Sequence, residues 1–271
     1  MLTQFSEFIT AYPRLFVLTG AGISTASGIP DYRDKDGEWK HTKPIDYKDF
    51  VDSYSMRQRY WARSTIGWVR FSAAQPSLTH RTLAAMERKG HLAITVTQNV
   101  DRLHQHAGSK NVIDLHGRND QVVCMNCATT LPRHYFHQNI IGLNPQLENI
   151  WARPAPDGDA HLNNFDFSSI AVPDCQMCDG IMKPNVVFFG ENIPAGRVND
   201  SLQALENADA LLILGSSLMV YSGYRFVRRA SEAELPIAAI NLGKTRADDL
   251  IDLKIEQGCD EVFDQYSAMS S

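Results

Sequence analysis

Residues 14–24 read Arg-Leu-Phe-Val-Leu-Thr-Gly-Ala-Gly-Ile-Ser, and this stretch decides the fold class. The apolar run at 14–19, bounded by Pro13 and Gly20, is typical of a strand buried on both faces. The small residues after it allow backbone amides to approach a phosphate. Thr25 stands where the usual Gly-x-Gly-x-x-Gly pattern has its third glycine, and a structural strand-to-helix turn would use the same residues. Cofactor binding and a structural turn therefore both stay open for this stretch alone.

Further apolar runs of the same character lie at residues 92–97, 112–115, 210–214 and 236–240. Amphipathic segments of helical length separate several of them, for example 78–88 and 219–232. Nearly continuous apolar strands that alternate with helices indicate a parallel sheet covered on both faces. The predicted fold is therefore α/β, with a Rossmann-like parallel sheet covered by helices.

Two segments interrupt this alternation. Residues 36–75 form a helical insertion, and residues 118–183 carry paired cysteines, a loop rich in Asn, Pro, Asp and Gly, and no clear periodicity. The second segment is predicted to be an inserted small domain. The predicted Rossmann-like domain then consists of residues 1–35, 76–117 and 184–271.

Four of the five cysteines form two close pairs, Cys124-Met-Asn-Cys127 and Cys175-Gln-Met-Cys178. Two Cys-x-x-Cys pairs can place four thiolates tetrahedrally around one Zn²⁺, which leaves no open position for water or substrate. The prediction is one structural zinc ion that staples the small domain. Two redox pairs or buried thiols are the alternatives. Cys259 lies outside the set, and taken alone it is typical of a core or helix-start position.

Composition and charge limit the classes of function. The 271 residues carry a formal net charge of −5, and no run of five Lys or Arg occurs, so nucleic-acid and membrane-surface roles gain no electrostatic support. No apolar stretch approaches the roughly 20 residues of a membrane span, and the first residues lack the pattern of a signal or transit peptide. We therefore expect a cytoplasmic protein. In such a reducing compartment, the paired cysteines are better explained as metal ligands than as disulfides.

Polar clusters directly follow several predicted strands: Gln98-Asn99-Val100-Asp101, His116-Gly117, Gly215-Ser216-Ser217 and Asn241-Leu242-Gly243. Carboxyl ends of parallel strands share one edge of the sheet, so these clusters are predicted to converge on one ligand crevice. A charged cluster at 27–33, behind the glycine-rich turn, also suits a functional loop. Each cluster alone has an ordinary structural explanation, such as a helix cap, a turn or a satisfied structural histidine.

In combination and in order, these motifs resemble the sirtuins across nearly the whole chain. The resemblance rests on residues 20–24, 28–33, 97–101, 115–117, the cysteine pairs, 183–191, 215–218 and 241–243. Segments 57–63 and 188–189 look most like the class II sirtuins, the branch that includes a mitochondrial lipoamidase. Many sirtuins have Phe at the position of Tyr32, so this chain has an additional hydroxyl beside the cofactor loop.

The resemblance implies a cofactor, a substrate and a set of site residues. NAD would be bound by Gly20, Ala21, Gly22, Ser24, Asp31, Tyr32, Arg33, Gln98, Asn99, Asp101, Gly215, Ser216, Ser217, Asn241, Leu242, Gly243 and Cys259. The catalytic residues would be Asn99, Asp101 and His116. Acylated-lysine protein substrates would be bound by Tyr60, Arg63, Val186, Val187, Phe188, Phe189 and Gly190, with Val186 to Gly190 as a strand edge.

By resemblance, the reaction begins when the acyl oxygen of the substrate attacks C1′ of the nicotinamide ribose. His116 would then act as general base, because imidazole with an ordinary pKa of about 6.5 is suited to proton removal near neutral pH. The products would be free lysine, nicotinamide and O-acyl-ADP-ribose. Tyr60 and Arg63 match the Tyr-x-x-Arg pair with which desuccinylating sirtuins bind an acyl carboxylate. A solvated Arg63 beside a core Tyr60 is the structural alternative.

Three other functions share parts of this pattern. A protein mono-ADP-ribosyltransferase would use the same cofactor and first bond cleavage with a different acceptor. A dehydrogenase lacks support because the standard glycine spacing is missing. A zinc-dependent interaction or nucleic-acid-binding module would have no use for Asn99, Asp101 and His116. The sequence specifies neither the oligomeric state nor the preferred acyl chain.

Overall fold

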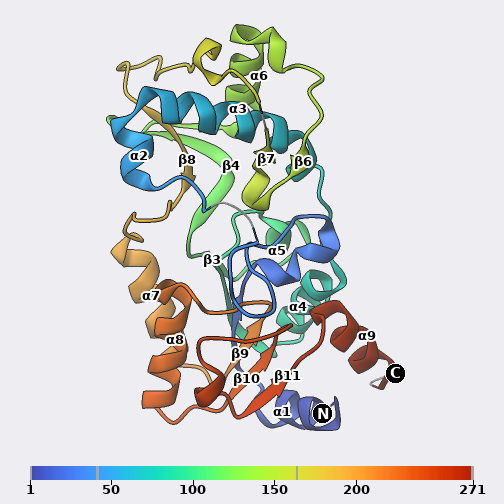
Figure 1. The fold of residues 1–271 in the computed structure, drawn as a ribbon. Helices are drawn as coiled ribbons and strands as arrows, with labels where there is room; N and C mark the ends of the chain where they lie inside the picture. Colours follow the sequence, from blue (N-terminus) through green and yellow to red (C-terminus); the bar gives the residue numbers. More distant parts are fainter. Residues whose placement is uncertain (1, 41–42, 163, 270–271) are drawn as a thin grey trace.

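The structure, a computed structural model, describes residues 2–40, 43–162 and 164–269, and its largest unit is a six-stranded parallel sheet in the order β11-β10-β9-β1-β2-β3 (Figure 1). Its strands are β1 (Leu15–Thr19), β2 (Leu92–Thr97), β3 (Val112–Asp114), β9 (Ala210–Leu214), β10 (Ile237–Ile240) and β11 (Leu253–Ile255). All neighbouring pairs in this sheet are parallel. The predicted α/β fold is confirmed, and the strand order is that of a Rossmann-like sheet.

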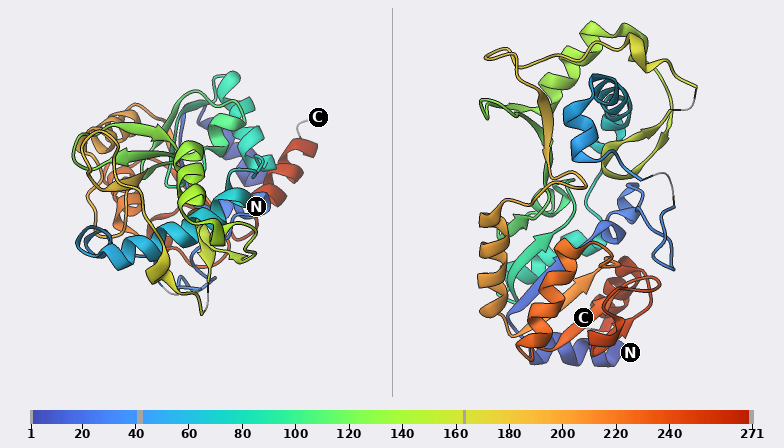
Figure 2. Two further views of the ribbon diagram at one scale, coloured as in Figure 1. Left: turned by 90° about the horizontal axis from the view of Figure 1, so that it is seen from above. Right: turned by 60° about the vertical axis from the view of Figure 1, so that its left-hand side comes forward.

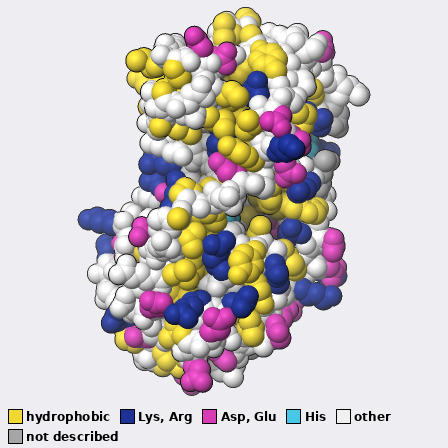
Figure 3. Space-filling view, turned by 90° about the vertical axis from the view of Figure 1, so that its left-hand side faces the viewer, with side chains coloured by type: hydrophobic (Ala, Val, Ile, Leu, Met, Phe, Trp, Pro, Cys, Tyr) yellow, Lys and Arg dark blue, Asp and Glu magenta, His cyan; other side chains and the backbone are white. Residues whose placement is uncertain are grey.

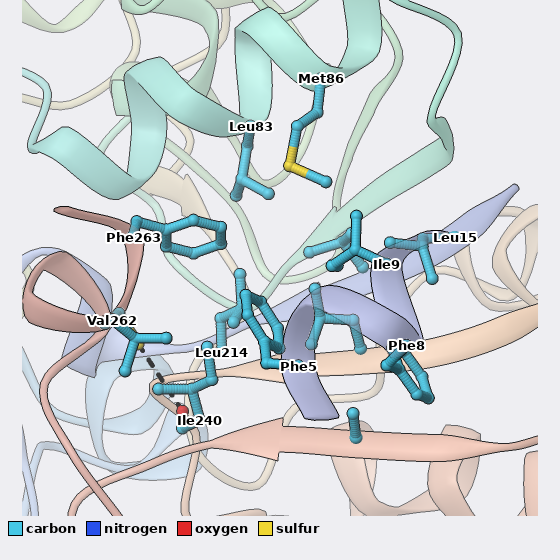
Figure 4. Packing of buried hydrophobic residues seen from close by; sticks show 14 of the residues in the cluster. Phe5, Phe8, Ile9, Leu15, Leu83, Met86, Leu214, Ile240, Val262 and Phe263 are labelled. Atoms are coloured by element: carbon cyan, nitrogen blue, oxygen red, sulfur yellow. Dashed lines mark hydrogen bonds between the residues drawn. The ribbon is translucent and has the colours of Figure 1, made fainter. Parts of the chain in front are cut away.

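Strand β1 lies in the middle of the sheet and is buried along its whole length. Leu15 and Val17 point into one hydrophobic cluster, whereas Phe16 and Leu18 point into another. This alternation is the two-residue period of a strand, and it requires apolar side chains on both faces. Figure 4 shows the first cluster, in which Phe5 and Phe263 from the two ends of the chain meet. The parallel sheet therefore has a core on each side.

Helices cover both faces of the parallel sheet. They are α1 (Leu2–Ala11), α4 (Leu78–Arg88), α5 (Leu103–His106), α7 (Ala195–Glu206), α8 (Tyr221–Glu232) and α9 (Cys259–Met269). Residues of α1, α4 and α9 contribute to the first cluster, and those of α7 and α8 contribute to the second. Helix α8 begins at Tyr221, two residues later than the sequence pattern suggests, because Leu218 has a φ of 58° and Val220 is extended.

The second body, which we call the small module, contains both insertions (Figure 2). Its elements are α2 (Tyr47–Asp52), α3 (Tyr54–Phe71), β4 (Gly117–Cys124), β5 (Thr130–Pro132), α6 (Arg133–Leu143), β6 (Arg153–Pro154), β7 (Ala160–His161) and β8 (Met182–Val186). Phe50 and Trp61 of the helical insertion share one core with Phe136 and Met182 of the cysteine-bearing segment. The two insertions therefore pack as one unit, although the division into domains stays a prediction.

Strands β6 and β7 form a short antiparallel hairpin within the small module. Its tip is a 3-10 turn at Pro156–Gly158, in which Asp157 has the left-handed φ of 56°. We call residues 153–161 the hairpin. Its tip packs against α3, where a Cβ on Gly158 would lie 2.9 Å from the Phe71 ring. Tertiary packing therefore orders a loop in which the sequence shows no periodicity.

The surface shows no single dominant charge on the face drawn in Figure 3, where Lys and Arg side chains alternate with Asp and Glu over both bodies. Among the described residues, no helix is long and apolar enough to cross a membrane.

Acid is expected to destabilise the protein through buried, neutral histidines. His80 and His104 are almost fully buried with ring centroids 4.8 Å apart. Burial lowers the pKa of His80 to about 4 and lowers the pKa of His104 well below its usual value. In the unfolded chain these histidines have pKa values of about 6.5, so between about pH 6.5 and pH 4 the unfolded chain binds more protons than the folded protein. Stability is therefore full above about pH 6.5 and decreases toward pH 4.

Urea unfolding between pH 7.5 and 4 measures this loss. His80→Gln should flatten the pH dependence by about 1.4 kcal/mol per pH unit at most, the contribution of one proton. His134→Gln is the matched control, because His134 is exposed. An equal slope in the wild type and His80→Gln would refute the assignment.

Candidate active site

The parallel sheet reverses its strand order between β1 and β9, and two glycine-containing turns meet at that edge. Gly20 N–H donates to Leu214 O over 3.0 Å, and Gly22 N–H donates to Gly215 O over 2.8 Å. A Cβ on Gly20 would lie 2.7 Å from Gly215 O, so a side chain at this position would force the turns apart. The glycines are therefore required by the close approach of two backbones. A crevice at such a reversal is the usual ligand site of open α/β sheets.

A cavity of about 910 Å³ opens at this edge and extends between the sheet and the small module. It is large enough for a dinucleotide together with part of a second substrate. The predicted site residues that line it are Gly20, Ala21, Gly22, Asp31, Tyr32, Arg33, Tyr60, Arg63, Gln98, Asn99, His116, Val186, Val187, Phe188, Phe189, Gly190, Gly215, Ser216, Ser217, Asn241, Leu242 and Cys259. Most of the predicted set, drawn from distant parts of the chain, thus surrounds one space.

Ser24, Asp101 and Gly243 lie outside the cavity lining. Ser24 Oγ donates to Asp101 Oδ2 over 2.7 Å, and Asn99 Nδ2 donates to Ser24 Oγ over 3.1 Å. The two residues thereby fix the amide of Asn99 from behind, and burial raises the pKa of Asp101. Gly243, with a φ of 84°, lies directly against the backbone of Lys35. The geometry gives these three residues supporting contacts.

His116 lies at the base of the cavity with both ring nitrogens hydrogen-bonded. Nδ1 lies 2.9 Å from the carbonyl oxygen of Gln98, which can only accept, so Nδ1 carries the proton and Nε2 is the basic atom. Nε2 lies 2.9 Å from Ser222 Oγ, which then donates to it. Burial, together with the positive charges of Arg197 and Arg225, lowers the pKa of His116 to about 4. The imidazole is therefore neutral at pH 7 and can accept a proton.

Ser222 was not among the residues predicted from the sequence. It lies in the first turn of α8, shortly after the Gly215-Ser216-Ser217 turn. A polar residue at a helix start after a strand-end loop is the signal that could have identified it, but such residues are common helix-start features. The position of the Ser222 hydroxyl shows from which side a hydroxyl group can donate a hydrogen bond to His116 Nε2.

The predicted strand edge at residues 186–190 is only partly a strand. Strand β8 ends at Val186, and residues 187–190, which we call the strap, continue without regular pairing. Glu191 Oε2 accepts from the Phe188 N–H over 2.8 Å, which takes that group out of any ladder. The strap is fixed at both ends, because Val187 N–H donates to His116 O over 2.7 Å and Tyr47 N–H donates to Phe189 O over 2.8 Å.

Tyr60 and Arg63 share one face of α3 and both line the cavity. The Tyr60 ring lies 5.2 Å from that of Phe188, so this wall adjoins the strap. Arg63 is paired within the protein. Its Nε and Nη2 donate to the two carboxylate oxygens of Asp159 over 3.1 and 2.5 Å. Asp157 and Asp159 also line the cavity, but the sequence pattern identified them only as loop residues.

The four paired cysteines lie together in the small module, with all four sulfur atoms within 4.8 Å of one another. Cys124 Sγ lies 3.5 Å from Cys178 Sγ, and Cys127 Sγ lies 3.7 Å from Cys175 Sγ. A tetrahedral site with Zn–S bonds of about 2.3 Å has S···S edges of about 3.8 Å. The cluster therefore fits one zinc ion, and its four thiolates would fill the coordination sphere.

Cys259 lies apart from the zinc-type cluster, at the start of α9 and on the cavity wall. Its thiol points toward Ile240 O at 3.6 Å. Burial raises the pKa of Cys259 to about 12, which keeps the thiol protonated and chemically inert. The residue contributes packing and backbone to this part of the cavity wall.

The fold and the site define an α/β protein with a four-cysteine cluster that fits zinc, a dinucleotide-type crevice and a neutral histidine that lines this crevice. Residues 20–222 match the model of the Sir2 family, and the chain belongs to this family. An NAD-dependent protein deacetylase of Xanthomonas campestris is 56% identical over 253 residues, which cover 93% of this chain and 86% of the relative. The NAD-dependent protein deacylase Sirt4 of Drosophila melanogaster is 43% identical, with 97% of this chain and 85% of the relative covered.

Solved structures of the same family have the same architecture. A complex of Sir2 with a p53 peptide and NAD⁺ superposes with a TM-score of 0.79 at 29% identity, covering 100% of this chain and 98% of the other. A Sir2 complex with an inhibitor, 2′-O-acetyl-ADP-ribose and a deacetylated p53 peptide gives 0.79 at 28% identity, covering 99% and 98%.

Proposed function

We propose that the protein is an NAD-dependent protein-lysine deacylase that transfers the acyl group from lysine to ADP-ribose, with release of nicotinamide and O-acyl-ADP-ribose. The observation that carries this proposal is the neutral His116, whose Nε2 accepts a hydroxyl hydrogen bond inside the cavity that begins at the glycine turns. Relatives named NAD-dependent protein deacetylase and deacylase, at 56% and 43% identity, support it. The Sir2 complexes with NAD⁺ and peptide support it as well.

The residues around the glycine turns fit NAD. Backbone amides at positions 20–22 and the small residues at 215–217 leave room for a pyrophosphate close to the chain. Gln98 and Asn99 line the cavity, and both of their amide nitrogens donate within the protein. Their amide oxygens remain to accept from the nicotinamide carboxamide. When bound, NAD supplies an electrophilic ribose carbon and, after loss of nicotinamide, the ADP-ribose that receives the acyl group.

His116 is the proposed general base. Gln98 O fixes the proton on Nδ1 and thereby leaves Nε2 to accept a proton from a hydroxyl group of the ribose. Ser222 holds this nitrogen in the absence of substrate, since its hydroxyl already lies at 2.9 Å. Asn99, fixed by Ser24 and Asp101, orients the bound cofactor in the same cavity.

Acylated-lysine proteins are the proposed substrates, bound along Val186 and the strap. These residues line the cavity beside His116, whose carbonyl group holds Val187. An extended peptide beside this segment would deliver its acyl-lysine side chain toward the base. We further propose that one structural zinc ion holds the small module together. The composition supports a cytoplasmic location, and segments 57–63 and 188–189 support a relationship to the class II sirtuins.

A panel of acetyl-, succinyl-, glutaryl- and long-chain acyl-lysine peptides, incubated with the protein with and without NAD, tests the function by mass spectrometry. NAD-dependent loss of an acyl group with formation of O-acyl-ADP-ribose is the expected result. Intact peptides together with ADP-ribosylated protein would refute deacylation and indicate the transferase alternative.

Arg63→Ala is expected to lower activity on succinyl- and glutaryl-lysine more than on acetyl-lysine. A substrate carboxylate can share the guanidinium with Asp159, whereas an acetyl group cannot. The expected difference in kcat/KM is on the order of tenfold, equivalent to about 1.4 kcal/mol. Arg59→Ala on the exposed face of α3 is the control. Equal losses on all acyl groups would show that Arg63 only holds Asp159.

A further inference from the structure

Tyr32 connects two parts of the cavity wall that are far apart in the sequence. Its hydroxyl donates to Asp157 Oδ2 at the tip of the hairpin, across 125 positions of the chain. Its ring packs edge-on against Trp39 and Phe189, at centroid distances of 5.9 and 6.1 Å. Burial and the neighbouring Asp157 both raise the pKa of Tyr32 well above its usual value, so the phenol stays a donor.

The segment that carries Tyr32, residues 28–40, is anchored to the parallel sheet at its other side. We call this segment the 28–40 loop. Lys35 O accepts from the Lys244 N–H over 2.7 Å, next to the close contact with Gly243. Within the loop, Lys40 N–H donates to Tyr32 O over 3.0 Å and Arg33 pairs with Trp39. The loop is thus a compact turn that rests on the sheet, and Tyr32 extends from it to the small module.

Asp157 is an acceptor in a fixed position. Asn119 Nδ2 donates to the Asp157 carbonyl group over 2.7 Å. Its φ of 56° and ψ of 29° lie in the left-handed region, which Asp and Asn adopt more readily than most residues other than glycine. The neighbouring Gly158 is pressed against the Phe71 ring. The hairpin tip therefore holds the Asp157 carboxylate toward the 28–40 loop.

We propose that the hydrogen bond between Tyr32 and Asp157 is a latch that positions the 28–40 loop against the hairpin, and so couples the NAD side of the cavity to its acyl side. Tyr32 and Asp157 are positioning residues in this proposal. The loop brings Asp31 and Arg33 to the NAD side, while the hairpin brings Asp159, the partner of Arg63, to the acyl side. Opening the latch removes the hydrogen bond between the loop and the hairpin, but it leaves the anchor at Lys244 and the ring contacts with Phe189 intact.

Two substitutions break the latch with little change in shape. Tyr32→Phe keeps the ring contacts with Trp39 and Phe189 and removes only the hydroxyl. Asp157→Gly removes the carboxylate and suits the left-handed backbone, so it adds no strain. Asp157→Asn keeps an acceptor oxygen and also tolerates this conformation. Tyr12→Phe is the control, because its ring packs on Phe8 at the far end of the sheet.

Hydrogen exchange of the protein without NAD tests the latch independently of activity. Tyr32→Phe and Asp157→Gly are each expected to raise exchange in both the 28–40 loop and the hairpin, with no further rise in the double variant. Asp157→Asn should restore most of the protection, and Tyr12→Phe should match the wild type. A rise confined to the mutated segment, or additive effects in the double variant, would overturn the proposal.

The consequence for catalysis rests on the proposed function and has its own readout. Calorimetric titration with NAD should show a Kd about five- to tenfold higher in Tyr32→Phe and Asp157→Gly, equally in both and in the double variant. In turnover, the KM for NAD should rise more than kcat falls. If both the 28–40 loop and the hairpin lost protection but the NAD affinity stayed unchanged, the latch would not couple the acyl side of the cavity to its NAD side. If neither the wild type nor any variant bound NAD, the proposed function would be wrong. The hydrogen-exchange result would still decide whether the latch exists.

Discussion

Cys175→Ser is expected to release zinc and unfold the small module. The four sulfur atoms lie at distances that suit one tetrahedral ion, and a structural zinc site contributes folding free energy directly. Cys175 is also part of the core that joins both insertions, so α3 and the strap should lose their support. Zinc content by atomic absorption should fall from about one ion per chain to near zero, and near-UV circular dichroism should decrease strongly.

Cys259→Ser is the matched control, because Cys259 is buried at the sheet and lies outside the cluster. It should keep one zinc ion. Full zinc content and an intact small module in Cys175→Ser would contradict the structural role of the four cysteines.

His116→Ala is expected to fold, bind zinc and lose turnover by about 10²- to 10⁴-fold, the usual contribution of a general base. The substitution removes the cavity-lining imidazole whose Nδ1 proton is fixed by the Gln98 carbonyl oxygen. NAD binding should persist, since the glycine turns and Asn99 are unchanged. Rates of O-acyl-ADP-ribose formation under saturating NAD and peptide measure the loss.

His134→Ala, an exposed position on α6, is the control and should retain wild-type rates. Ser222→Ala separates the base from its partner, because it removes the hydroxyl on Nε2 and leaves the Gln98 contact at Nδ1. It should retain most of the activity. Near-normal deacylation by His116→Ala would refute the base assignment.

Local patterns in the sequence were sufficient for the fold class. The run at 14–19 predicts β1 because both faces of a central parallel strand must be apolar. Leu15 packs into the core on one side of the sheet and Phe16 into the core on the other. The glycines at 20 and 22 are visible in the sequence because no other residue fits against Gly215. The Cys-x-x-Cys spacing likewise predicts a cluster, since each pair sets two thiols in one tight turn.

The sequence could not predict which insertions share a core. Trp61 of α3 and Phe136 of α6 are 75 positions apart and meet only because both helices pack into one core with β4 and β8. The end of the predicted strand at Val186 was missed for a similar reason. Glu191 Oε2 takes the Phe188 N–H and thereby ends the ladder, and this side-chain competition is not encoded in hydrophobic periodicity.

The sequence by itself determined the parallel sheet, the glycine turns and the four-cysteine cluster, because each depends on residues close together in the chain or on a strict steric need. Only the tertiary structure decided that Ser222 holds His116, that Asp159 occupies Arg63 and that Tyr32 reaches Asp157. These contacts join residues 106, 96 and 125 positions apart. A hydrogen bond needs its two atoms within about 3 Å, and over such separations only the packing of whole elements brings them there.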